Sequence, residues 1–269
     1  MEYLKAVLLA TVEGLTEFIP ISSTGHLVLV DRVVDLGFGP SFAKTFIVVI
    51  QLPAILSVVV YFWSRLWPFA KPPQERRAVF DVWLKVIVAV IPAGVLGLLF
   101  DDLIESYLLW EVPVAAALIA GGAALLYIES MSKSPTHTSI ADLRYATALK
   151  IGLFQCLAMW PGMSRSASTI IGAMLLGASR PVAAEFSFFL AIPTMVGATM
   201  LTIVKKGGGF TPHEWSVLAV GCVVSFLVAY ASIAFLMAYI QKHDFRIFGW
   251  YRIVLGIVVV CVYLLYRAE

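Results

Sequence analysis

EGLTEFIPISSTGH, residues 13–26, is the stretch that decides the fold. It interrupts the first strongly apolar segment of the chain with two carboxylates, a proline, three consecutive hydroxyl side chains, a glycine and a histidine. A simple membrane span does not carry so many polar residues in its middle. The stretch therefore predicts two half-helices joined by a polar loop. A membrane tolerates such a loop only where protein buries it or where it lines a wet cavity.

The composition places this stretch in a membrane. The chain has 269 residues, of which 61% are hydrophobic and 13% charged, whereas a soluble domain is about 25% charged. The net charge of +2 provides no basic face for nucleic acid. The three cysteines lie in apolar runs without CxxC spacing, which indicates inert thiols rather than disulfides or zinc ligands. We predict an all-α integral membrane protein.

Six segments are apolar over the roughly 20 residues that a helix needs to cross a bilayer. They are residues 44–63, 83–100, 112–128, 185–204, 215–239 and 250–266. Two further apolar regions are interrupted: 3–30 is broken at Pro20, and 147–178 is broken at Pro161 and Gly162. Each interrupted region predicts a re-entrant pair of half-helices.

The two interrupted regions also predict an internal repeat. IPISST (19–24) is followed by AKTFIVVIQLP (43–53), and WPGMSRS (160–166) is followed by AAEFSFFLAIP (183–193). We therefore expect a single membrane domain, 1–269, with repeat one at about 1–130, a linker at about 131–146 and repeat two at about 147–269. Three spans in each half make the second repeat enter from the opposite side. The result is an inverted repeat whose broken helices meet near the midplane, as in many transporters.

The lysines and arginines orient this arrangement. In the two-repeat scheme, 13 of the 19 fall on one side, Lys85, Arg165 and Arg252 among them, and six fall on the other. The positive-inside rule makes the side with 13 cytoplasmic. The first re-entrant pair and an acidic loop that begins at Asp101 then face outward.

Glu13 and Glu17 are four residues apart, so a helix places them on one face. Two carboxylates in an apolar helix repel one another and lose hydration. A divalent cation that they share with phosphate oxygens would resolve both problems. The alternative is that both side chains reach interfacial water near a helix end.

Pro20 is expected to end that helix, and Ser22, Ser23 and Thr24 are residue types that cap the start of the next one. A helix N-terminus has free N–H groups and a positive dipole end, which suit an anion. Gly25 would permit close backbone approach, and His26 could exchange protons near neutral pH. Taken singly, each of these residues has an ordinary structural explanation; beside two glutamates, together they favour a site.

PGMSRSAST (161–169) repeats this design with an arginine. Its hydroxyl residues, Ser164, Ser166, Ser168 and Thr169, cluster at a predicted helix start. Arg165 at membrane depth needs a partner, and its fork suits a phosphate or a carboxylate. The alternative is a structural salt bridge to Glu13 or Glu17, which would still bring the two motifs together. Gln51 could contact the site or bond another helix.

The combined residues predict a phosphate site with a divalent metal. Phosphoryl transfer depends above all on positioning and charge neutralisation. A serine hydroxyl could attack phosphorus and form a covalent intermediate, or a metal-activated water could attack directly.

At these residues the chain resembles the undecaprenyl-pyrophosphate phosphatases, also called bacitracin-resistance phosphatases. EGLTEFIPISSTGH and PGMSRSAST resemble the two signature segments of that family, and the resemblance extends over nearly the whole chain. Ala167 and Pro53 depart from the pattern, where glycine is expected. The resemblance implies removal of the terminal phosphate of undecaprenyl pyrophosphate to recycle the cell-wall lipid carrier. It further implies a multi-pass protein of the bacterial cytoplasmic membrane with its site facing the periplasm or exterior.

The resemblance also implies roles for residues. Glu13 and Glu17 would hold Mg²⁺ or Ca²⁺ or act as base. Ser23 would be the nucleophile and His26 a general acid or base, while Arg165 would clamp the pyrophosphate. The residues predicted to bind substrate are Ser22, Thr24, Gly25, Gln51, Ser164, Arg165 and Ser166.

The partners implied are the lipid substrate and membrane lipids, with no nucleic acid. Bacitracin would act on the substrate rather than on the protein, and a homodimer stays open. The main rival hypothesis is a polyprenyl-phosphate flippase or another inverted-repeat transporter, because such a protein would need the same charges for the same headgroup. An ion channel is disfavoured, because the sequence has no filter motif.

Overall fold

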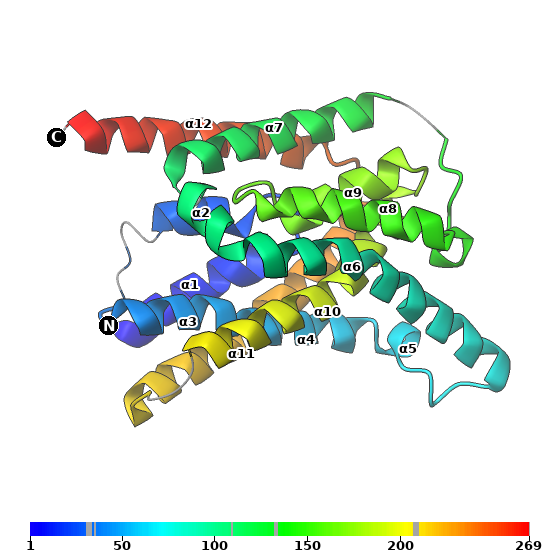
Figure 1. Cartoon of the computed structure of the whole chain (residues 1–269), viewed down its shortest axis with the longest axis horizontal. Coiled ribbons are helices and arrows are strands. Elements are labelled where there is room, and N and C mark those ends of the chain that lie inside the picture. Colours follow the sequence, from blue (N-terminus) through cyan, green and yellow to red (C-terminus); the bar gives the residue numbers. More distant parts are fainter. Residues whose placement is uncertain (31–33, 35, 109, 132–133, 207–209, 269) are drawn as a thin grey trace.

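The chain forms a bundle of α-helices (Figure 1). The computed structural model describes residues 1–269 except 31–33, 35, 109, 132–133, 207–209 and 269. The helices are α1 (Glu2–Thr16), α2 (Ser23–Val30), α3 (Pro40–Val49), α4 (Gln51–Tyr61), α5 (Trp63–Leu66), α6 (Pro73–Leu108), α7 (Glu111–Ser130), α8 (Tyr145–Gln155), α9 (Arg165–Leu175), α10 (Arg180–Lys206), α11 (Pro212–Tyr239) and α12 (Arg246–Ala268). The described residues contain no β-strand.

Among the described residues, six stretches are long and apolar enough to cross a membrane, as predicted. They are Phe42–Tyr61, Pro73–Phe100, Glu111–Ser130, Arg180–Leu201, Pro212–Tyr239 and Arg246–Leu265. The second starts ten residues before the predicted 83, because Pro73 begins a helix whose first turns are polar. The same helix, α6, runs to Leu108, so the acidic segment predicted as a loop is helical. The chain is an all-α integral membrane protein.

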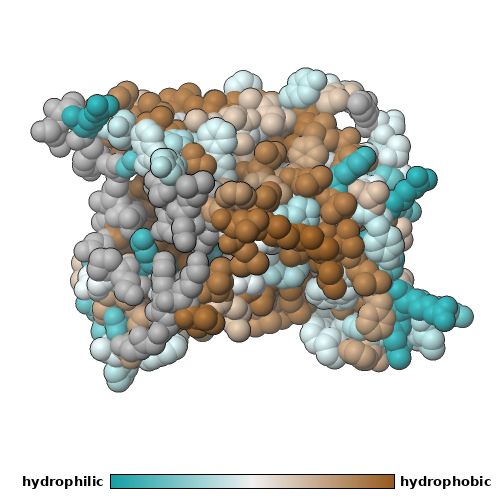
Figure 2. All heavy atoms as spheres, in the orientation of Figure 1, coloured by the Kyte–Doolittle hydropathy of each residue, from teal (hydrophilic) through white to brown (hydrophobic). Residues whose placement is uncertain are grey.

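The outer surface supports this conclusion, because many large apolar side chains are exposed, and they are concentrated over the middle of the face shown in Figure 2. Helix α6 crosses the front of the molecule with one apolar face turned outward (Figures 1 and 2). The exposed residues of that face recur every three or four positions: Leu84, Ile87, Ile91, Val95 and Leu98. This spacing gives one stripe along a helix, here facing outward, where lipid replaces water as the solvent.

The first span is divided in two at Ile50, between α3 and α4. Pro53 lies in the first turn of α4 and has no N–H with which to continue the hydrogen bonds of α3. Ser225 of α11 donates a 2.7 Å hydrogen bond to the Ile50 carbonyl oxygen, which satisfies the carbonyl group at the break. The break leaves Gln51 at the start of α4.

Both interrupted regions are broken helices, as predicted. Helix α1 ends at Thr16, four residues before Pro20, and residues 17–20 form turns. On the other side of the break, α2 begins at Ser23. The second break lies between α8 and α9 and contains a short 3₁₀-helix, Cys156–Met159. At 15 residues α1 is about 22 Å long, short of the roughly 30 Å hydrocarbon layer. Re-entry from one side stays a prediction.

Helices of the two halves pack in matching pairs. Helix α1 packs along α11, and α8 packs along α6. Helices α7 and α12 lie side by side along the upper edge of Figure 1. Gly122 allows them to approach closely, because it has no side chain. A Cβ added there would lie 2.6 Å from the Gly249 carbonyl oxygen. This pairing is compatible with a repeat, but the repeat, its inverted relation and its boundaries stay predictions.

Three of the cations assigned to the cytoplasmic side lie inside the protein, two of them buried and one half-buried. Lys85 is 3% exposed, pairs with Asp81, and donates to the carbonyl oxygens of Ile140 and Ala141 in the linker. Arg252 is 0% exposed, and the Arg165 side chain is 11% exposed. They therefore do not count as loop charges, which leaves ten cations against six. The side predicted to be cytoplasmic therefore still has the larger number of cations.

Candidate functional site

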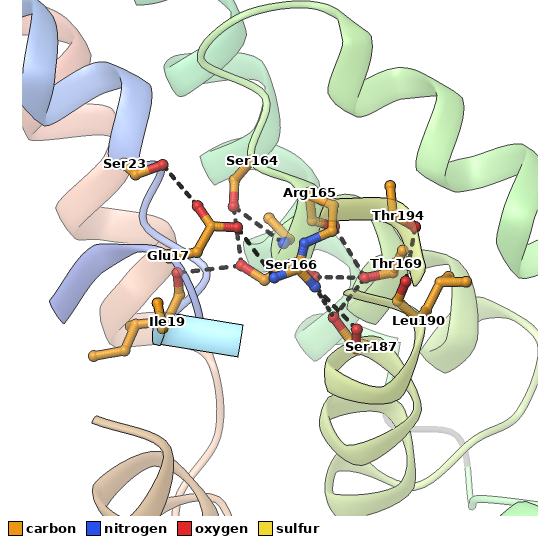
Figure 3. Close-up of polar contacts among 12 residues, drawn as sticks. Glu17, Ile19, Ser23, Ser164, Arg165, Ser166, Thr169, Ser187, Leu190 and Thr194 are labelled. Atoms are coloured by element: carbon orange, nitrogen blue, oxygen red, sulfur yellow. Dashed lines mark hydrogen bonds and ion pairs between the residues drawn. The ribbon is translucent and has the colours of Figure 1, made fainter. Parts of the chain in front are cut away.

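The loops after α1 and before α9 meet inside the bundle (Figure 3). The buried hydroxyl of Ser166 donates to the Ile19 carbonyl oxygen at 3.2 Å. Arg165 Nη2 lies 3.2 Å from Glu17 Oε1. The two polar motifs, almost 150 residues apart in sequence, are thus joined by one main-chain contact and one ion pair. The salt bridge considered for Arg165 from the sequence is present, and its partner is Glu17.

Each loop ends in a serine with the same unusual backbone. Ser22 has φ +75° and Ser164 has φ +70°, and among the described non-glycine residues they alone have positive φ. The Ser22 hydroxyl accepts from the Gly25 N–H at 3.3 Å, and the Ser164 hydroxyl accepts from the Ala167 N–H at 3.2 Å. These contacts cap α2 and α9, at the helix starts that the sequence predicts. Ser22 supplies the cap, which leaves the Ser23 hydroxyl for other contacts.

Glu17 connects the two candidate reacting groups. The Ser23 hydroxyl donates to Glu17 Oε2 at 2.9 Å, and Arg165 donates to Oε1 of the same carboxylate at 3.2 Å (Figure 3). Arg165 Nη1 also donates to the Ser187 carbonyl oxygen at 2.9 Å. A hydroxyl held by a carboxylate beside a guanidinium combines a nucleophile, a base and a cation that binds anions.

The remaining hydroxyls of the second motif are used within the protein. Ser168 donates to the Ser164 carbonyl oxygen at 2.8 Å, and Thr169 donates to the Arg165 carbonyl oxygen at 2.9 Å. Ser166 is fully buried and ties the two loops together. Within the second motif, the half-buried side chains placed to meet a substrate are those of Ser164 and Arg165.

Glu13 is the least satisfied group of the site. It is 0% exposed, and neither of its carboxylate oxygens has a hydrogen-bond partner in the described part of the chain. Glu17 and Arg165 act on it electrostatically, and the half-buried Gln51 lies beside it without reaching hydrogen-bond geometry. A buried charge without a partner is costly, so this carboxylate has free capacity for a cation.

The residues present fit a divalent cation bound with help from substrate. No group of three or more His, Cys, Asp or Glu side chains gathers among the described residues. The protein therefore offers the carboxylates of Glu13 and Glu17. Mg²⁺ is commonly held in this way, by one or two carboxylates together with substrate phosphates and water. The metal itself stays a prediction.

Replacing Glu13 by glutamine should stabilise the metal-free protein while lowering its activity. Burial and the neighbouring Glu17 disfavour a carboxylate at this position, and glutamine removes that cost, so we expect the free energy of unfolding to rise by about 1–3 kcal/mol. Thermal unfolding in detergent with a chelator measures this effect. Glu129→Gln is the matched control, because Glu129 is also buried but is bonded to Arg180 and to the Phe245 N–H. That change should destabilise. A lower melting temperature for Glu13→Gln would contradict the assignment.

His26 is bonded away from the Glu17 carboxylate. Its Nδ1 donates to the Ser22 carbonyl oxygen at 2.7 Å, because a carbonyl oxygen can only accept. Its Nε2 lies 2.7 Å from the Tyr251 hydroxyl, and the two rings stack with centroids 5.6 Å apart. Its role as general acid or base stays a prediction, and in this structure Nε2 has the Tyr251 hydroxyl as its partner.

Two neighbouring residues of α2 differ in what they can offer a substrate. A Cβ added at Gly25 would lie 2.9 Å from a methyl group of Leu118. The close approach that Gly25 permits in this structure is therefore between α2 and α7; its role in substrate binding stays a prediction. Thr24 is half-buried in the first turn of α2.

Three residues of the site were not predicted from the sequence. Ser187 holds Arg165, Tyr251 holds His26, and the fully buried Arg252 donates to both loops. Arg252 had been assigned to the cytoplasmic side, but it lies inside the predicted span 250–266. An arginine within a span is a functional hypothesis in itself, and that signal could have found it. Ser187 is the one hydroxyl in the apolar stretch AAEFSFFLAIP.

The fold and this geometry define a class: a multi-pass membrane protein with a carboxylate, hydroxyl and arginine site between two broken helices. Comparison with known proteins identifies the family, because the model described as "Bacitracin resistance protein BacA" matches residues 6–258. The chain belongs to this family.

Close relatives extend over nearly all of the chain. The "Undecaprenyl-diphosphatase 1" of Clostridioides difficile (strain 630) is 53% identical over 267 residues, which are 98% of this chain and 97% of the relative. The "Undecaprenyl-diphosphatase" of Fusobacterium nucleatum subsp. nucleatum is 53% identical over 94% of this chain and 98% of its own length. That of Enterococcus faecalis is 48% identical over 97% of each.

Proposed function

We propose that the protein hydrolyses undecaprenyl diphosphate to undecaprenyl phosphate and inorganic phosphate. The relatives named for this activity match at least 94% of the chain. The observation that carries the proposal is the contact series from the Ser23 hydroxyl through Glu17 to Arg165. It lies between two broken helices inside a membrane protein, where a lipid tail can stay in hydrocarbon while its headgroup meets polar groups.

In the proposed reaction the Ser23 oxygen attacks the terminal phosphorus. Glu17 accepts the Ser23 proton, for which it already forms the hydrogen bond. The new Ser–O–P bond forms as the bridging P–O bond breaks, and undecaprenyl phosphate leaves. Water then hydrolyses the phosphoserine and releases phosphate. Direct attack by water on the diphosphate is the alternative, and it would make the Ser23 hydroxyl dispensable.

Arg165 neutralises negative charge on the phosphate during this step. Its two terminal nitrogens point to Glu17 and to Ser187, so the guanidinium is held before substrate arrives. A preorganised donor of this kind stabilises the transition state more than it stabilises the substrate. A divalent cation bound by Glu13 and Glu17 would add further charge neutralisation.

Phosphate release by the purified protein in detergent, from a polyprenyl diphosphate, tests the proposal. The wild type should release phosphate. A chelator should lower the rate by at least about tenfold, and added Mg²⁺ or Ca²⁺ should restore it, because without a cation the Glu13 carboxylate, which has no bonded partner, would repel the substrate phosphates. Full activity in chelator would contradict the metal. A wild type that releases no phosphate with any cation but moves the lipid across vesicles would favour a flippase instead.

We further propose that the protein lies in the bacterial cytoplasmic membrane with the site facing outward. The cation distribution, ten against six after removal of the buried side chains, supports this orientation. In a chain without its native cysteines, Ser134→Cys should react with an impermeant thiol reagent only after cells are opened. Gly39→Cys should react in intact cells, and its Cβ would meet no atom within 4 Å. The reverse pattern would invert the topology.

A further inference from the structure

Arg252 of α12 is fully buried and donates to both loops of the site. Its Nη1 donates to the Pro20 carbonyl oxygen at 3.4 Å, in the loop between α1 and α2. Its Nη2 donates to the carbonyl oxygens of Gly162 at 3.1 Å and Met163 at 2.8 Å, in the loop before α9. A further contact, at 3.3 Å, reaches the Ala117 carbonyl oxygen of α7. One side chain thus bridges the two segments that carry the candidate reacting groups.

The sequence of α7 makes room for this contact. Arg252 lies on the same face of α12 as Gly249 and Gly256, the face that packs on α7. A Cβ added at Gly121 of α7 would lie 2.2 Å from Arg252 Nη2. The guanidinium therefore passes over α7 at the point where α7 has no side chain, and any larger residue there would displace it.

The loop acceptors of Arg252 lie one or two residues before the two strained serines. Pro20 lies two residues before Ser22, and Met163 lies immediately before Ser164. Both serines have a φ near +70°, which a side-chain-bearing residue keeps only where its surroundings over-determine it. No ion pair of Arg252 with a carboxylate is present among the described residues, so its polar contacts there are with main-chain carbonyl oxygens.

We propose that Arg252 is a positioning residue that fixes the two loops relative to one another and so keeps Ser23 and Glu17 in reach of Arg165. Its catalytic consequence rests on the proposed function, whereas its effect on loop order does not. The neighbouring Tyr251 adds a second contact from α12 to the first motif through His26. A lysine at position 252 would keep the charge but could not bridge carbonyl oxygens on both loops with one planar fork.

The test compares Arg252→Lys with Arg246→Lys. Arg246 also lies on α12 and donates to a main-chain carbonyl oxygen, that of Glu129, but away from the loops. Arg252→Lys should lower kcat for phosphate release by about 10²-fold, with KM changed much less, because small misplacements of reacting groups have effects of this size. Arg246→Lys should leave kcat unchanged. Loss of activity through KM alone, or equal losses in both variants, would overturn the positioning role.

Hydrogen exchange of the backbone gives a readout that needs no activity. In Arg252→Lys, amides of residues 17–22 and 160–164 should exchange faster than in wild type, and in Arg246→Lys they should not. If wild type releases no phosphate but both loops loosen in Arg252→Lys alone, the proposed function fails and the positioning role stands. If wild type is active and the loops stay unchanged, the positioning role fails.

Two further variants guard against a purely structural effect. The loss from Arg252→Lys should be much smaller in an Arg165→Lys background, because a positioning effect acts through the group positioned. Additive losses would contradict it. Gly121→Ala, which displaces the guanidinium without altering it, should loosen the same two loops. If neither Arg252→Lys nor Gly121→Ala yields folded protein, Arg252 is a folding residue and the inference is overturned.

Discussion

Arg165→Lys should lower the rate of phosphate release by about 10²–10³-fold, since loss of one preorganised donor to a developing anion has an effect of this size. The guanidinium is held from three sides: by the Glu17 carboxylate, by the Ser187 carbonyl oxygen and by the Phe18 ring, 5.8 Å away. A lysine retains the charge but cannot keep two of these contacts and face a phosphate. The loss should fall mainly on kcat, measured by steady-state phosphate release.

Arg180→Lys is the matched control for this experiment. Arg180 also pairs with a buried carboxylate, that of Glu129, at the start of α10. It contacts neither loop of the site, so its replacement should affect stability and leave kcat near the wild-type value. Activity of Arg165→Lys within threefold of wild type would remove Arg165 from the proposed clamp.

The fold could largely be predicted from the sequence because membrane spans are encoded by local composition. All six spans follow from runs of apolar residues, and both breaks follow from prolines with polar neighbours. The ends of helices are less visible to hydropathy. Helix α6 begins at Pro73 with polar turns and ends at Leu108. A helix can continue beyond the apolar segment, because its backbone hydrogen bonds do not depend on apolar side chains.

The part of the site that could be predicted from the sequence is the set of contacts between side chains of the two motifs. Three polar residues stand in apolar regions of the sequence: Glu17, Ser23 and Arg165. A carboxylate in such a region is expected to bond a hydroxyl or a guanidinium. Arg252 stands out in the sequence as an arginine inside a predicted span, but its partners do not, because they are main-chain carbonyl oxygens, which every residue has. The contact from Tyr251 to His26 likewise depends on how α12 lies against α2, and only the tertiary structure determines that.

Glu17→Gln should lower the rate of phosphate release by about 10³-fold or more, in the upper part of the range for loss of a general base. Glutamine is nearly isosteric and can still accept a hydrogen bond from Ser23, but it cannot take up the serine proton. It also loses the ion pair with Arg165 and one of two candidate metal ligands. Glu185→Gln is the matched control, because Glu185 is also buried and ion-paired, with Arg65, outside the two loops.

The double variant with Ser23→Ala then identifies the attacking group. If Glu17 activates Ser23, then Ser23→Ala, Glu17→Gln and the double variant should all be nearly equally inactive, because residues that act as one unit lose their function together. If water attacks the diphosphate directly, Ser23→Ala should retain most of the activity while Glu17→Gln remains inactive. Phosphate transferred to Ser23, detected by mass spectrometry after rapid acid quenching, would decide for the covalent route. Glu17→Gln with more than a tenth of wild-type activity would exclude Glu17 as the base in either route.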